Sequence, residues 1–398
     1  MCHLDSVYSA PSFPLNGIRL IQPITLASLR AGSPGLPLPG EFSTGACDGK
    51  LGWMDVLDPA FLIREARAGD HPQLLNLARE LDSINLPTDS RAMHEAIDRS
   101  VQAFRGRIRD RSRSVFIFCA QERATRRLVA ASMIIGKHGT PAAPHYYLEM
   151  DSDERYSHTL RKSFRHPYLR LRYSMDGPTE IGGLIVTAAM RGHAERVGKQ
   201  ISWVRFLYIG MHRRRFEDQV LAEMLAPMLP EHGNIFWDHY GRSVTGLSFR
   251  EADILSARDK EFIRALFPDT PLYTFLLPDE VRGSLGAVGE NTRGAVRLLE
   301  QAGMKFLKHI DPFDGGPYYG APTDQLLPVQ QVSTHAISVG EPVAERARQY
   351  LLAHENHGFR AVRVDAEVPE PGRLIVRAGV LHALGVKPRA KVYAVPLP

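Results

Sequence analysis

The sequence predicts an α+β protein in which a mixed β-sheet is flanked by helices and followed by a small β-rich unit. Thr179–Tyr208 passes from an apolar run of β character directly into residues whose apolar positions recur at helical spacing. Ser114–Gln121 and Leu128–Ile135 are apolar runs joined by a charged segment, as in an antiparallel hairpin. Near the C-terminus, Arg373–Pro396 contains short alternating runs typical of strands.

The other elements follow from the same periodicities, taken along the chain. A strand followed by two amphipathic helices opens the predicted fold, and Arg- and aromatic-rich pieces after the hairpin predict extra strands. These predictions cover strands at Phe61–Ala66, 146–173, Gln219–Met224 and Tyr273–Leu277, and helices at 74–81, 93–104, 194–211 and 292–301.

Composition divides the chain into three parts. With 398 residues and 44% hydrophobic content, the chain can form a large core and two packed units. Residues 1–58 are rich in Pro, Gly and Ser without a sustained period, and we expect a poorly ordered extension there. We assign residues 59–321 to the main α+β region and residues 322–398 to a linker and the small β-rich C-terminal unit.

Several classes of protein are disfavoured by the sequence. No run approaches the length of a membrane-spanning helix and no secretory signal is recognisable, so we expect a cytoplasmic protein without a membrane partner. The net charge of +5 is spread over arginine-rich faces, which does not favour nucleic-acid binding. The three cysteines lack metal-ligand spacing, and the sixteen histidines are scattered, so we expect no metal.

The turn between the central strand and its helix has the outline of an anion site. It contains Arg191, Gly192 and Gly198. The first N–H groups of a helix have no partner within the helix and can bind a phosphate. An ordinary strand-to-helix connection also needs glycine, and spacing alone leaves both interpretations open.

Several segments together resemble a known family of enzymes. The segments are PTEIGGLIV, RFLYI, AEM, FWDHYGR, SFREAD, KEFI, PLYTFLLP, IDPFDGGP and RLIVRAGVLHALGV, in that order. The stretch 179–208 resembles the central strand, pyrophosphate loop and helix of the GNAT acyltransferases. The full set is similar to the arginine N-succinyltransferase family, from about Phe61 to the C-terminus.

The resemblance implies a fold and an activity. The implied fold is GNAT-like, with a mixed, splayed sheet. The implied reaction is acyl transfer from acyl-CoA, with succinyl-CoA first among the candidates, to arginine or a related amino acid in arginine catabolism. Transfer to a different amine, or a catalytically degenerate subunit that only binds, are the alternatives. The expected partners are the small-molecule amine and a second or related subunit in a homo- or hetero-oligomer.

The resemblance also implies which residues bind the two substrates. Gly182 and Gly183 would open the central strand, so that the pantetheine arm of CoA could pair with its backbone. Carboxylates on elements lining the expected cleft would hold an amine or guanidinium by charge-assisted hydrogen bonds. The cofactor-binding candidates are Leu184, Ile185, Val186, Arg191, Gly192, Arg196 and Gly198, and the substrate-binding candidates are Glu180 and Glu223.

Three positions depart from the family pattern. Gly289 stands where the family has a histidine assigned as proton donor, so the catalytic residue stays unassigned. Arg196 stands where a loop glycine is expected, and Leu225 replaces an arginine that follows AEM. In contrast, Asn85-Leu86-Pro87 occupies the place of the family's acceptor-side loop.

Overall fold

The protein was analysed as a computed structural model, which describes residues 59–80, 86–229, 233–256 and 259–398. The predicted extension, residues 1–58, lies outside the described residues, as does Asn85 of the expected acceptor-side loop.

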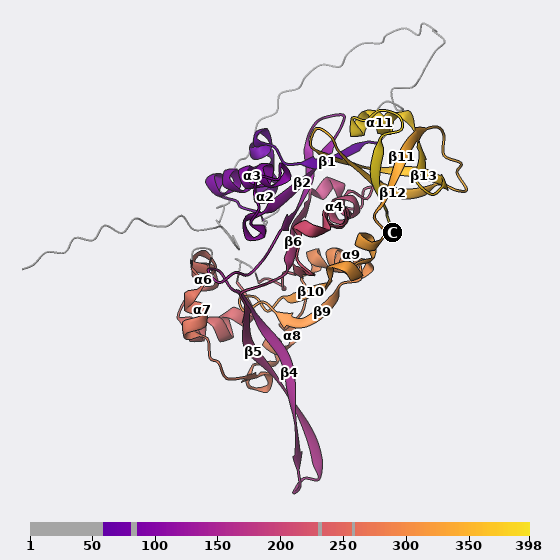
Figure 1. The fold of residues 1–398 in the computed structure, drawn as a ribbon. Coiled ribbons are helices and arrows are strands. Elements are labelled where there is room, and N and C mark those ends of the chain that lie inside the picture. The colour runs from indigo at the N-terminus through magenta and orange to yellow at the C-terminus, as the bar shows by residue number, and fades with distance from the viewer. Residues whose placement is uncertain (1–58, 81–85, 230–232, 257–258) are drawn as a thin grey trace, which may run out of the picture.

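A mixed β-sheet forms the centre of the fold (Figure 1). Its middle strands run in the order β1-β2-β3-β6-β7-β10-β9-β4-β5-β8, and all of these neighbours are antiparallel except β6 and β7, which are parallel. The predicted α+β class with a mixed sheet is therefore confirmed. The strands are β1 (Phe61–Glu65), β2 (Val115–Glu122), β3 (Leu128–Ile135), β4 (His145–Ser157), β5 (Lys162–Ser174), β6 (Thr179–Val186), β7 (Gln219–Glu223), β8 (Leu272–Tyr273), β9 (Lys305–Ile310) and β10 (Pro317–Pro322).

Helices cover both faces of the sheet because its strands are apolar on both sides. On β2, Phe116 and Phe118 pack with the helix α4, whereas Val115 and Ile117 pack with α2 and α3. A third apolar cluster lies under the helices near β4 and β9, around Trp237. The helices are α2 (His71–Glu80), α3 (Ser90–Phe104), α4 (Val197–Met211), α5 (Arg242–Thr245), α6 (Phe249–Ser256), α7 (Glu261–Leu266), α8 (Asp279–Ser284), α9 (Arg293–Gln301), α10 (Leu327–Gln330) and α11 (Ala378–Leu384).

The central strand β6 has a break in its pairing. Its pairing with β3 extends to Val186 but shifts register near Gly183, whose φ is +58°. A Cβ at Gly183 would lie 2.9 Å from Met133 Cγ, so a glycine fits this bulge where a larger residue would not. On its other edge, β6 pairs with β7 at Thr179 and Glu180. The two parallel strands are thus paired at their N-terminal ends.

The strands after residue 332 form a ring. β12 pairs with both β15 and β13, and the order β12-β15-β11-β14-β13 closes around one apolar cluster. β13 also pairs with β1, so the ring continues the main sheet. Its strands are β11 (Ser333–Val339), β12 (Arg348–Glu355), β13 (Phe359–Glu370), β14 (Arg373–Val376) and β15 (Lys391–Pro396). The division predicted at residues 321 and 322 stays a prediction.

Two predicted elements differ from the structure. The strand expected at Tyr273–Leu277 is limited to β8, because Thr274–Leu276 forms a turn of 3-10 helix instead. The helix expected from about Ala194 begins at Val197, because Arg196 before it adopts a left-handed backbone. Within the described part of the chain, no helix combines the length and the apolar character that crossing a bilayer requires.

Candidate active site

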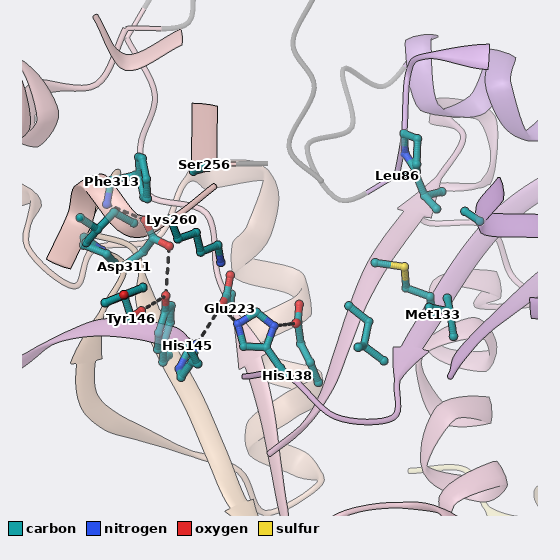
Figure 2. Close-up of a pocket in the computed structure, with 18 of the residues that line it drawn as sticks. Leu86, Met133, His138, His145, Tyr146, Glu223, Ser256, Lys260, Asp311 and Phe313 are labelled. Atoms are coloured by element: carbon teal, nitrogen blue, oxygen red, sulfur yellow. Dashed lines mark hydrogen bonds and ion pairs between the residues drawn. The ribbon is translucent and has the colours of Figure 1, made fainter. Parts of the chain in front are cut away.

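A cavity of about 110 Å³ opens between the sheet and the helices α3, α6 and α7. This volume has room for several water molecules or for part of a small ligand. Apolar side chains such as Leu86 and Met133 form one wall, and charged groups converge on the other (Figure 2). The charged and imidazole groups of the lining are Arg99, His138, His145, Glu180, Glu223, Lys260 and Asp311.

Two glycines place His138 in this cavity. The residue lies in the loop between β3 and β4, and its N–H donates to the Pro178 carbonyl at 2.7 Å. A Cβ at Gly177 would lie 1.8 Å from the His138 carbonyl oxygen, and Gly139 has a φ of +91°. The loop can therefore press against the residues before β6 only because these positions lack a side chain.

His138 forms the centre of a group of polar side chains. Its Nδ1 lies 2.7 Å from Glu180 Oε2, and its Nε2 lies 3.9 Å from Glu223 Oε1. His145, the first residue of β4, places its Nδ1 3.9 Å from the same Glu223 oxygen. Two carboxylates and two imidazoles from different elements thus meet at one end of the cavity (Figure 2).

Aromatic rings hold His145 in place. Its imidazole stacks on Tyr318 of β10, with ring centroids 5.2 Å apart, and on Tyr147, at 5.5 Å. It meets the His138 ring edge to face at 4.6 Å. These ring contacts restrict the rotation of the imidazole and so limit the directions that its nitrogens can face.

The surroundings shift the pKa values of the two histidines in opposite directions. Burial disfavours the charge on His138, but the carboxylates of Glu180 and Glu223 outweigh it and raise its pKa. Burial, together with the charges of His138 and Lys260 and the nearby His309, holds the pKa of His145 well below its usual value. The geometry therefore favours a protonated His138 beside a neutral His145, a pairing that can separate acid and base roles.

The side chains of His138, His145 and Glu223 are spaced so that a small cation would fit among them. One ligand atom each from His138, His145 and Glu223 lies within 4.8 Å of the other two. The side chain of Lys260 points toward Glu223 in Figure 2.

The turn after β9 borders the cavity through Asp311, Pro312 and Phe313, and the Asp-Gly-Gly segment that follows them is structural. Asp311 Oδ1 accepts the N–H of Phe313 at 2.7 Å, and its Oδ2 accepts the Tyr318 hydroxyl at 3.0 Å. Asp314 Oδ1 accepts the N–H of Gly316 at 2.7 Å. These bonds fix the turn after β9 and orient Tyr318, the ring that stacks on His145.

The predicted substrate residues and the predicted cofactor residues lie in different places. Glu180 and Glu223 both line the cavity. The cofactor candidates follow along β6 and the turn before α4, outside the lining of the cavity. Leu184 and Val186 pack against the cluster that contains α4, whereas the side chain of Ile185 belongs to the opposite core under α2 and α3.

The turn before α4 presents its basic residues to solvent. Arg191, Gly192 and Arg196 are exposed, and Gly198 lies in the first turn of α4. Gly192 has a φ of +74°. Arg196, at the position where a glycine was expected, takes a φ of +50°, which is the backbone that a glycine would adopt there. Arg196 therefore adopts the left-handed backbone that favours glycine, and its side chain adds a guanidinium to this turn.

Gly289 lies beside the segment that follows β7. Its N–H donates to the Leu225 carbonyl at 3.1 Å, and it precedes a short 3-10 turn. No described residue of the cavity lining comes from this turn. The position of the missing histidine and the charged cavity are thus formed by different segments.

Sequence reasoning missed both cavity histidines. It treated the sixteen histidines as scattered, because His138 and His145 are seven residues apart, without helical or metal-binding spacing. The available signal was that the two histidines enclose a short segment that begins with Gly139 and ends with Pro144, a turn that follows a buried strand. The predicted acceptor-side loop does contribute Leu86 and Pro87 to the lining.

A comparison with protein families adds a second kind of evidence. The family model described as "Arginine N-succinyltransferase beta subunit" matches residues 61–327, about two thirds of the chain. The chain belongs to the arginine N-succinyltransferase family. The resemblance expected from the sequence is therefore confirmed.

The chain aligns with relatives in the arginine N-succinyltransferase family over nearly the whole length of those relatives. The chain is 29% identical over 339 residues to the arginine N-succinyltransferase subunit beta of Pseudomonas aeruginosa, covering 84% of this chain and 98% of the relative. It is 28% identical over 331 residues to the arginine N-succinyltransferase of Escherichia coli, covering 81% and 94%.

One solved structure shares the fold. The arginine/ornithine succinyltransferase subunit AI from Pseudomonas aeruginosa superposes with a TM-score of 0.73 at 24% identity, covering 85% of this chain and 99% of that one.

Proposed function

We propose that this chain is an acyl-CoA-dependent N-acyltransferase that transfers a succinyl group from succinyl-CoA to the amine of arginine or a related amino acid. Its membership of the arginine N-succinyltransferase family supports the reaction class. The observation that carries the choice of substrate is the pair of carboxylates, Glu180 and Glu223, at one end of the cavity.

The charges of the cavity suit an amino acid with a basic side chain. Carboxylates bind ammonium and guanidinium groups by charge-assisted hydrogen bonds. Lys260 supplies a cation in the same cavity, where the carboxylate of an amino acid or of a succinyl group can pair with it. The apolar wall that includes Leu86 and Met133 fits the methylene chain between such groups.

The CoA site in this proposal runs along β6 to the start of α4. The β7-facing backbone of Leu184, Ile185 and Val186 would pair with the pantetheine arm, since β7 pairs only with the beginning of β6. The pyrophosphate would lie at the first turn of α4 against Gly192, Arg196 and Gly198, with Arg191 nearby. With the pyrophosphate at the C-terminal end of β6, the pantetheine arm would lead back along β6 toward Glu180 and the charged cavity.

A second candidate follows from one observation. Gly289 has no proton to donate, so the chain could be a degenerate subunit that binds CoA and assembles with a related, active subunit. The relatives are named as a subunit beta and a subunit AI, which is consistent with assembly from more than one subunit. We favour an active enzyme over the degenerate subunit, because the cavity offers other groups that can transfer a proton. We place this enzyme in the cytoplasm.

A thiol-release assay tests the proposal. The purified full chain is incubated with succinyl-CoA and with arginine, ornithine, lysine or an unrelated amine, while free CoA thiol is followed. We expect arginine or a close relative to be acylated fastest. Equal rates on all amines would replace this proposal with transfer to another acceptor. Tight CoA binding by calorimetry without any thiol release would favour the degenerate subunit.

A further inference from the structure

The cavity contains a set of polar atoms that the family resemblance does not assign. Glu223 Oε1 faces two imidazole nitrogens, His138 Nε2 and His145 Nδ1, each at 3.9 Å. This separation is too long for a direct hydrogen bond, but a nitrogen atom displaced to one side of the line between His145 Nδ1 and Glu223 Oε1 can lie about 2.8 to 3 Å from both. His145 and Glu223 can therefore both accept hydrogen bonds from one amine nitrogen, with His138 beside them.

We infer that the acceptor amine is seated between His145 and Glu223, beside His138, and that Nδ1 of His145 takes its proton. This inference rests on the proposed function and deepens it, because it names the amine site and the base. It moves proton transfer from the position of Gly289 to a different set of segments, the β3–β4 loop, β4 and β7.

The environment of His145 suits a base. A general base must be unprotonated before the reaction and must reach the proton that it removes. The groups that face His145 from the surrounding elements are His138 from the β3–β4 loop, Glu223 from β7, Tyr318 from β10, His309 from β9, and Lys260 before α7. Burial and the cations among these groups keep the imidazole neutral.

His138 has a different part in the same arrangement. Its Nδ1 is held by Glu180 at 2.7 Å, so its Nε2 is directed toward Glu223. In the protonated state His138 cannot accept a proton from the amine. It can only orient Glu223 and balance part of the negative charge of the two carboxylates. We therefore assign His138 and Glu180 as positioning residues.

The proposed step balances in protons and electrons. The ammonium of the acceptor gives one proton to His145, and the nitrogen lone pair then attacks the thioester carbon to form the C–N bond. The C–S bond breaks, and its electron pair leaves with the CoA sulfur, which takes the second proton of the nitrogen. His145 finally releases its proton to solvent, so the products are the amide, CoA thiol and one proton.

The test compares three variants with one control in the full chain. With succinyl-CoA and arginine, we expect His145→Gln to lower kcat by about 100-fold or more, the order of a lost general base, and to leave the KM for succinyl-CoA within about threefold. We expect Glu223→Gln to raise the KM for arginine by about tenfold, as for one lost charge-assisted bond. His138→Gln should shift the pH profile of kcat/KM. His335→Gln, which changes a buried histidine of β11 far from the cavity, is the control and should stay within about twofold of wild type.

Arginine binding, measured by calorimetry with CoA present, separates this inference from the proposed function. Thiol release that His145→Gln leaves unchanged would overturn the inference while the proposed function stands. Absence of thiol release in the wild type would contradict the proposed function, and the amine seat would then stand only if Glu223→Gln still weakened arginine binding. Activity that EDTA abolishes and Zn²⁺ restores would also overturn the inference, since a metal ion would then occupy the position of the amine.

Discussion

Nδ1 of His138 lies 2.7 Å from Oε2 of Glu180, and both side chains are buried. The pair joins the loop after β3 to the first residues of β6. The two residues are 42 positions apart in the sequence. An ion pair in this position fixes the loop and also determines which imidazole nitrogen faces the cavity. Glu180, predicted as a substrate residue, therefore has a structural contact with His138 in addition to its place in the lining.

Replacing Glu180 by Gln should destabilise the protein. The change leaves His138 without its carboxylate partner in a buried site, and we expect the free energy of unfolding to fall by about 2 kcal/mol. Urea denaturation of the full chain measures this change. Glu345→Gln, at an exposed position, is the matched control and should change stability by less than about 0.5 kcal/mol. Equal stability of both variants would contradict a role for the pair.

The pH dependence of stability should reveal the neutral state of His145. Its pKa lies well below 6.5 in the fold and rises to the ordinary value when the chain unfolds, so the unfolded chain binds more protons just below pH 6.5. The contribution of His145 is thus present above pH 6.5 and is lost as the pH falls toward the folded pKa.

The variant His145→Gln lacks this titration. Between about pH 7 and pH 5, its free energy of unfolding should fall less steeply than that of the wild type, by up to about 1.4 kcal/mol per pH unit. Slopes are compared because the substitution also changes packing against Tyr318. Parallel curves would show that His145 titrates normally in the fold.

CoA affinity should depend on the side chain of Arg196. Arg196→Gly keeps the left-handed backbone before α4 and removes the guanidinium, so we expect CoA binding to weaken about tenfold, and more at low salt. Arg126→Gly is the control, because Arg126 also has a positive φ but lies in the turn between β2 and β3. Calorimetry with CoA gives both affinities. Similar effects of the two substitutions would indicate a general loss of charge and not a phosphate contact.

Restoring a histidine at position 289 should be tolerated by the fold. Gly289 has φ −60° and ψ 151°, and an added Cβ would meet the Ala226 carbonyl oxygen at 3.4 Å, which is an ordinary contact. We expect Gly289→His to change the free energy of unfolding by less than about 1 kcal/mol and to raise kcat by at most about tenfold. A wild type without turnover whose Gly289→His variant is active would identify a degenerate subunit instead.

The elements with strong periodicity could be predicted from the sequence. The strand at Thr179–Val186 and the hairpin strands near 115–122 and 128–135 match the observed β6, β2 and β3, because short apolar runs bounded by polar residues predict strands that are buried within a sheet. The length of the strand at β8 was overestimated, since nothing in the local sequence shows that Thr274 leaves the sheet. Helix starts shifted by a few residues, as at Arg196, where backbone geometry and not hydrophobicity sets the boundary.

The sequence by itself determined the α+β class, the family, the glycine at position 289 and the two carboxylates on β6 and β7, because each of these is local information. Only the tertiary structure decided that His138 and His145 meet Glu180 and Glu223 in one cavity. Their encounter depends on long-range pairings, on the close packing of the loops at Gly139 and Gly177, and on the stacking of Tyr318. The protonation states of the two histidines depend on burial and on neighbouring charges that no sequence spacing encodes.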